Sequence, residues 1–213
     1  DCPPIPKFLE PYEYLGNAKP GQVHVVSPHP RMRLHSQMAN ASISEIDNIQ
    51  GREPCLMSPE DAAANGIKDG DLVEVYNNRG AIIVGARVDK RIMKGVISIY
   101  EGCWPSVDSK GRCNSGLINF VTSSKCSSQL SQATTANTTL ASIKKCTDPD
   151  GPNMAYTKPA IIKSDITLDP AFYGLARAAD LKSKVSANLS PGEKIFYQRC
   201  TVCHGPKDPT HFT

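Results

Sequence analysis

Residues 72–88 read LVEVYNNRGAIIVGARV and predict the central hairpin of a β-rich fold. Leu72 to Tyr76 and Ala81 to Val88 are rich in β-branched residues, which favour extended strands. The four residues between them, Asn77 to Gly80, tolerate positive φ and therefore suit a turn. The stretch predicts one strand, a tight turn and a returning strand.

Further short strands and one helix surround this hairpin in the sequence. We expect strands at Val23 to Val26, at Val96 to Tyr100 and at Gly116 to Val121. Between the first and second of these, Ser58 can cap a short helix that Gly66 ends. Short strands at this spacing predict a mainly β fold with short helices, closed into a barrel of mixed topology rather than a doubly wound sheet.

The composition is that of an ordinary globular protein. The 213 residues include 24 Lys and Arg against 21 Asp and Glu, so the formal net charge is +3. This charge is too small to indicate a nucleic-acid partner. The sequence has no run of about 18 apolar residues, so we expect no direct membrane insertion. No signal-peptide pattern follows Asp1, and for an exported protein we expect the signal to lie upstream.

Two polar stretches differ from the scaffold around them. The first, from Ser27 to Gln37, contains two His, two Arg, Ser and Gln directly after a strand, a dense set of donors for phosphate or a polar heterocycle. The second, from Ser128 to Thr139, is uncharged, and its amides suit a neutral polar pocket. Each stretch could equally be a surface loop, and the residues alone leave both interpretations open.

Several motifs, in the same order along the chain, carry a family resemblance. Together they cover about residues 22–145 and are similar to the dimethyl sulfoxide / trimethylamine N-oxide / biotin sulfoxide reductase family, nearest to its trimethylamine N-oxide reductases. One departure is Pro105, which follows Trp104 where the family has Tyr. The motifs are Ser27-Pro28-His29-Pro30, Arg33-Leu34-His35-Ser36-Gln37, Arg52-Glu53-Pro54, Ser58-Pro59-Glu60-Asp61-Ala62, Asn77-Asn78-Arg79-Gly80, Glu101-Gly102-Cys103-Trp104, Asn119-Phe120-Val121-Thr122 and Ser128-Gln129-Leu130-Ser131-Gln132-Ala133-Thr134.

The resemblance implies a double-psi (aspartate-decarboxylase-like) β-barrel that is the last domain of a catalytic subunit. In the family this barrel closes over a bis(molybdopterin guanine dinucleotide) cofactor with molybdenum, and the substrate is a small N-oxide or S-oxide. Upstream domains of the same reductase would supply the metal-ligating Ser, so the isolated fragment is expected to be inactive. The positions that match the cofactor contacts are His29, Arg33, His35, Ser36, Gln37, Asn119 and Gln132.

A C-x-x-C-H motif, Cys200 to His204, lies near the end of the chain. Two thiols at this spacing can add to the vinyl groups of haem c, and the adjacent His204 is then the axial ligand of the haem iron. A helix starting after Ser190 leads into the motif, which resembles the first helix of class I cytochromes c. A zinc half-site completed by His204 and His211, or a dithiol redox pair at Cys200 and Cys203, stay open as alternatives.

The haem motif and the Pro-rich stretches divide the chain. We expect a connecting segment at 1–19, the barrel at 20–146, a linker that can hold a helix at 147–187, and an incomplete c-type haem module at 188–213. All 5 Met residues precede Cys200, so no distal Met follows the motif, and we expect the natural protein to continue.

The two parts together imply a periplasmic enzyme, because bacteria attach haem c outside the cytoplasm. Its fused haem would relay electrons from a quinol-linked multihaem c-type cytochrome. Two other functions stay open. One is a stand-alone module for a nucleotide-like ligand, and the other is a small electron-transfer haem protein with a structural barrel.

Overall fold

The structure, a computed structural model, describes residues 4–128, 130–150 and 190–192. The chain divides into two compact units, Asp1–Pro159 and Ala160–Thr213. In the second unit Pro191 and Gly192 are helical and follow Ser190, where the sequence predicts a helix start. The proposed haem-attachment residues Cys200, Cys203 and His204 lie outside the described residues. Within the described residues, no helix is long and apolar enough to cross a membrane.

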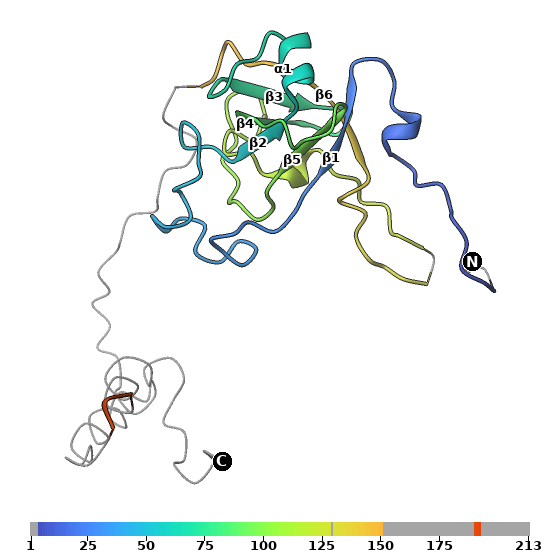
Figure 1. Cartoon of the computed structure of the whole chain (residues 1–213), viewed down its shortest axis with the longest axis horizontal. Coiled ribbons are helices and arrows are strands. Elements are labelled where there is room, and N and C mark those ends of the chain that lie inside the picture. The colour runs from blue at the N-terminus through green and yellow to red at the C-terminus, as the bar shows by residue number, and fades with distance from the viewer. Residues whose placement is uncertain (1–3, 129, 151–189, 193–213) are drawn as a thin grey trace. The chain divides into compact units, whose positions relative to one another are not determined.

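The described part of the first unit is mainly β (Figure 1). Its helices are short: the 3-10 helices η1 (Leu15–Asn17) and η2 (Ile118–Phe120), and the α-helix α1 (Pro59–Ala64). Its strands are β1 (Gln22–Val26), β2 (Pro54–Met57), β3 (Leu72–Tyr76), β4 (Ala81–Val88), β5 (Val96–Ile99) and β6 (Thr139–Lys145).

The strands close into one barrel in the order β1-β5-β2-β4-β3-β6. Two neighbouring pairs are parallel, β1 with β5 and β2 with β4. The other four pairs are antiparallel. A closed barrel of mixed topology is therefore confirmed, and its two parallel pairs in an otherwise antiparallel ring agree with the expected double-psi β-barrel.

The predicted hairpin and helix both form. β3 and β4 pair antiparallel from Leu72 opposite Gly85 to Tyr76 opposite Ala81. At the start of α1 the Ser58 hydroxyl oxygen accepts a hydrogen bond from the Asp61 backbone N–H at 3.1 Å. This cap satisfies one of the free donors of the first helical turn, as the sequence predicts.

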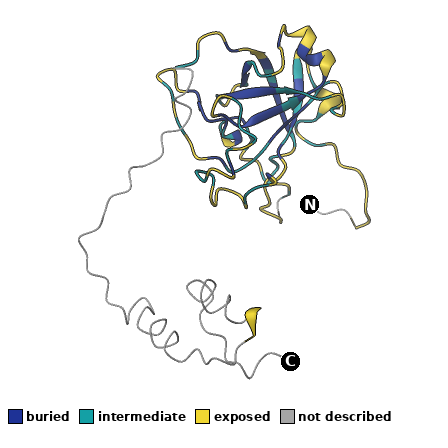
Figure 2. Cartoon of the chain, turned by 60° about the vertical axis from the view of Figure 1, so that its left-hand side comes forward, coloured by how far each residue is buried: buried dark blue, intermediate teal, exposed yellow. Residues whose placement is uncertain are grey.

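Buried hydrophobic side chains from every strand of the ring form the core of the barrel, and Figure 2 shows the buried stretches of the strands in dark blue. Each such side chain stabilises the fold by about 1.5–3 kcal/mol when it leaves water, which makes the interior the main source of stability. A fixed interior in turn gives the loops between strands a rigid base. Fully buried members include Val25, Val73, Val75, Ile82, Val84, Ile97 and Ile99.

The prediction of a strand at Gly116 to Val121 is wrong, because this segment contains the 3-10 helix η2 instead. Side chains of the β3–β4 turn bind the Val121 carbonyl, which a strand would need for hydrogen bonds to a neighbouring strand. The side-chain amide of Asn77 and the Nε–H of Arg79 both donate to the Val121 carbonyl, at 2.8 and 2.7 Å. Tertiary hydrogen bonds thus override the local preference for a strand.

Candidate functional site

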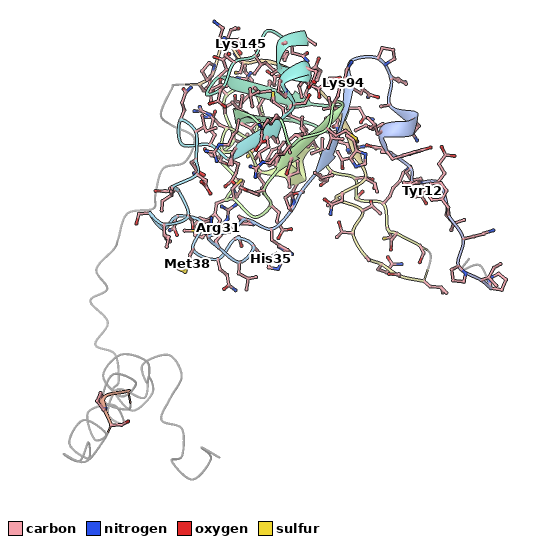
Figure 3. The ribbon with its side chains drawn as sticks, viewed as in Figure 1. Tyr12, Arg31, His35, Met38, Lys94 and Lys145 are labelled. Atoms are coloured by element: carbon pink, nitrogen blue, oxygen red, sulfur yellow. The ribbon has the colours of Figure 1, made fainter. Side chains whose placement is uncertain are left out.

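The polar stretch after β1 opens a long loop, residues 27–50, on one side of the barrel. Figure 3 labels Arg31, His35 and Met38 on this loop. Non-glycine residues rarely adopt positive φ, yet His35 and Met38 have φ of 49° and 59°. Such backbone geometry persists only where surrounding contacts hold it in place.

The side chain of Arg33 provides such contacts for His35 from inside the loop. Its Nη2 lies 2.9 Å from Oε1 of Glu53, and both side chains are almost fully buried, at 3% and 4% exposure. The same guanidinium donates to the backbone carbonyls of Glu101, at 2.7 Å, and His35, at 3.1 Å. Arg33 therefore points inward and ties the loop to two other segments of the chain.

Glu101, two residues after the end of β5, brings two histidines of the loop together. Its Oε1 lies 2.7 Å from Nδ1 of His29 and 2.6 Å from Nδ1 of His35. The two imidazole rings meet edge to face, with centroids 4.8 Å apart. Since Nδ1 of each ring faces the carboxylate, Nε2 is the ring atom that remains for a ligand.

The segment after Glu101 packs closely on the loop. Gly102 has φ of 85°, and a Cβ built at this position would lie 2.3 Å from the carbonyl carbon and oxygen of His35. Only glycine fits this approach. Two residues on, the indole N–H of Trp104 donates to the Ser36 carbonyl at 3.1 Å. Residues 101–104 and the loop thus form one wall.

An open pocket of about 530 Å³ lies against this wall. It brings together three of the predicted cofactor contacts, His35 and Ser36 from the loop and Asn119 from η2. Glu101 and Trp104 also line it. Residues far apart in the sequence therefore present imidazole, hydroxyl, amide and indole groups to one space.

A second, smaller cavity of about 230 Å³ lies beside the pocket, and Cys103 and Trp104 line both. Glu53 lines the smaller cavity. Its Oε2 is buried and has no hydrogen-bond partner among the described residues. Burial raises the pKa of Glu53 from 4.5 to about 7, although Arg33 acts in the opposite direction. The cavity thus has a carboxyl group that takes up a proton near neutral pH.

The remaining predicted residues do not line the pocket. Gln37 is exposed on the loop, where its backbone N–H donates to the Leu34 carbonyl at 2.9 Å. Gln132 lies between η2 and β6, and its Oε1 accepts a hydrogen bond from Sγ of Cys126 at 3.1 Å. Asn137 holds that segment to the end of β1, because its Oδ1 accepts from the Ser27 backbone N–H at 2.6 Å.

Two acidic residues of the site were not among the predicted contacts. Glu101 and Glu53 stand in the motifs Glu101-Gly102-Cys103-Trp104 and Arg52-Glu53-Pro54, so the sequence marked their position but not their role. Each owes its role to a partner in the loop: His29 and His35 for Glu101, Arg33 for Glu53. The signal that could have found them is an acidic residue within each motif.

Comparisons with known proteins match the barrel. Residues 23–140 match the family described as molydopterin dinucleotide binding domain. A dimethyl sulfoxide/trimethylamine N-oxide reductase of Rhodobacter capsulatus is 44% identical over 154 residues, which cover 70% of this chain and 19% of that protein. A trimethylamine-N-oxide reductase of Haemophilus influenzae is 38% identical over 151 residues, 68% of this chain and 18% of that protein. The chain thus spans about a fifth of the length of these curated relatives.

A solved structure matches at the level of the fold. Acetylene hydratase from Pelobacter acetylenicus superposes with a TM-score of 0.52 at 18% identity, over 67% of this chain and 21% of that one. At that identity the likeness supports the fold alone. It agrees with the barrel described above.

Proposed function

Because the chain belongs to the molybdopterin dinucleotide-binding domain family, we propose that it is the C-terminal part of a molybdenum-dependent reductase of small N-oxides or S-oxides. The observation that carries this proposal is the pocket that joins His35, Ser36 and Asn119, three positions carried over from the reductase family. The 44% identity to a curated reductase over 154 residues supports it. The short span of the chain relative to its relatives supports upstream domains in the same protein.

The residues that line the pocket, together with His29 next to His35, fit a polar heterocycle with phosphate groups. His29 and His35 keep Nε2 for a ligand, and both side chains are more than half exposed. Ser36 and Asn119 add a hydroxyl and an amide, which read the edge of a pterin or guanine ring. We propose that these four residues hold part of a bis(molybdopterin guanine dinucleotide) cofactor, and that Gln37 and Gln132 contact it beyond the pocket.

When bound, the cofactor supplies the molybdenum redox chemistry that removes an oxygen atom from the substrate, with two electrons and two protons consumed. The chain's own residues bind and orient it. Arg33 acts from below the binding surface, since its guanidinium is taken up by Glu53 and by two backbone carbonyls. We propose that Arg33 holds His35 and Glu101 in position and does not itself contact a phosphate, although its charge suggests such a contact.

We further propose that Cys200 and Cys203 attach haem c and that His204 is the axial ligand of its iron. The support is the C-x-x-C-H spacing itself. The haem would pass single electrons to the cofactor from a quinol-linked multihaem c-type cytochrome. Attachment of haem c outside the cytoplasm would place the enzyme in the periplasm.

An assay of the full-length protein tests the proposal. The protein, purified from cells supplied with molybdate, is expected to contain molybdenum and guanine nucleotide. It is also expected to reduce trimethylamine N-oxide or dimethyl sulfoxide with a reduced dye as electron donor. A full-length protein that binds a nucleotide but no molybdenum would contradict it and favour a stand-alone binding module.

A further inference from the structure

We propose that His29, His35 and Glu101 bind a divalent metal ion such as zinc, nickel or copper when the chain holds no cofactor. The ligand atoms are Nδ1 of each imidazole and Oε1 of the carboxylate. This proposal goes beyond the reductase function and does not rest on it. It concerns only residues on the described surface of the barrel.

The three ligand atoms already lie close together. Oε1 of Glu101 lies 2.7 and 2.6 Å from the two Nδ1 atoms, and all three atoms lie within 4.8 Å of one another. Tetrahedral zinc with bonds of about 2.0–2.1 Å separates its ligand atoms by about 3.3 Å. An ion therefore needs the carboxylate oxygen and each nitrogen to move apart by about 0.6–0.7 Å.

Buried contacts hold the three ligands in this arrangement. The guanidinium of Arg33 binds the backbone carbonyls of both His35 and Glu101, so one fixed group positions two ligands. Gly102 allows the chain after Glu101 to approach His35 closely. A site that is organised before the ion arrives loses less conformational entropy on binding.

The chemistry of the ligands selects the class of ion. Two imidazole nitrogens and one carboxylate oxygen suit zinc, nickel or copper, whereas magnesium and calcium prefer oxygen ligands alone. The side chains of His29 and His35 are 66% and 62% exposed, so an ion can reach them from solvent. Three protein ligands leave a fourth position for water. A bound ion would join the loop to the segment after β5 and stabilise both.

Calorimetric titration with zinc chloride tests the site in the full chain, expressed without molybdate. The background carries Cys200→Ser and Cys203→Ser, so that the two thiols of the C-x-x-C-H motif do not compete for zinc. One ion is expected to bind per chain. Glu101→Gln and, separately, His29→Ala are each expected to weaken binding about tenfold or more. Titration with magnesium chloride is expected to give no binding.

His24→Gln is the matched control, because His24 lies in β1 and contacts the Asn137 carbonyl. It is expected to bind zinc like the background chain. Circular dichroism confirms that each variant is folded, and His29→Ala changes only an exposed side chain. No zinc binding by the background chain would overturn the proposal, as would equal affinity in His29→Ala and His24→Gln. The molybdenum content of the full-length protein, measured separately, tests the reductase function on its own.

Discussion

Arg33 and Glu53 form an ion pair of 2.9 Å beneath the candidate site, with both side chains almost fully shielded from water. Glu53 immediately precedes β2, so the pair fixes the loop to the barrel itself. The guanidinium also binds the carbonyls of His35 and Glu101. The position of the exposed histidines therefore depends on a buried charge that itself does not line the pocket.

Replacing Arg33 by Met should destabilise the protein by roughly 3–5 kcal/mol, the usual cost of breaking a buried ion pair. Arg31→Met is the control, because Arg31 is exposed on the same loop and surface changes usually stay within about 0.5 kcal/mol. Urea unfolding followed by circular dichroism gives both free energies. Equal losses of unfolding free energy in the two variants would contradict a stabilising role of the buried ion pair.

Glu53 should make stability depend on pH in a defined window. Burial raises its pKa in the folded chain from 4.5 to about 7. A carboxyl group whose pKa is higher in the folded chain than in the unfolded chain stabilises the fold at pH values below the unfolded pKa. This contribution is lost as the pH rises through about 7. The unfolding free energy of the wild type, relative to Glu53→Gln, should therefore fall between pH 4.5 and pH 7. A difference that stays constant across this range would contradict the shift.

Gly102→Ala should disturb the site, because the added Cβ would meet the backbone of His35 at 2.3 Å. Gly111 is a matched control: it has φ of 76°, close to the 85° of Gly102, and nothing lies within 4 Å of its added Cβ. Gly111→Ala should cost about 1 kcal/mol for backbone strain alone. Gly102→Ala should cost clearly more in urea unfolding. Similar costs would mean that the close approach to His35 is unimportant.

Covalent haem is expected at Cys200 and Cys203 when the chain is expressed with a haem-attachment system. The pyridine haemochrome spectrum and the mass of the intact chain measure it. A variant with both residues changed to Ser should carry none. A wild-type chain without covalent haem would leave the zinc half-site or the dithiol pair as the use of this motif.

The sequence predicted those elements whose signals are local. The β3–β4 hairpin has strand formers on both sides of the four-residue turn Asn77 to Gly80, and Ser58 caps α1 as expected. β2 was missed because it has four residues and begins with Pro54, which usually argues against a strand. β6 was missed because it follows the polar stretch and is defined by pairing with the distant strands β1 and β3.

The site was predictable only in outline. The polar residues after β1 marked the loop, and the family motifs pointed to His35, Ser36 and Asn119, which the fold brings to one pocket. That Arg33 turns inward could not be read from its neighbours, because its acidic partner is Glu53, twenty positions along the chain. Which residues point outward is decided by tertiary contacts rather than by residue type.

The most direct test of the central claim is the cofactor content of the full-length protein carrying His35→Ala, compared with His24→Gln. Molybdenum is measured by mass spectrometry and guanine nucleotide after acid release. If the loop after β1 holds the cofactor, His35→Ala should lower both quantities together, while His24→Gln should match the wild type. Unchanged molybdenum and nucleotide in His35→Ala would contradict the assignment of this pocket as the cofactor site.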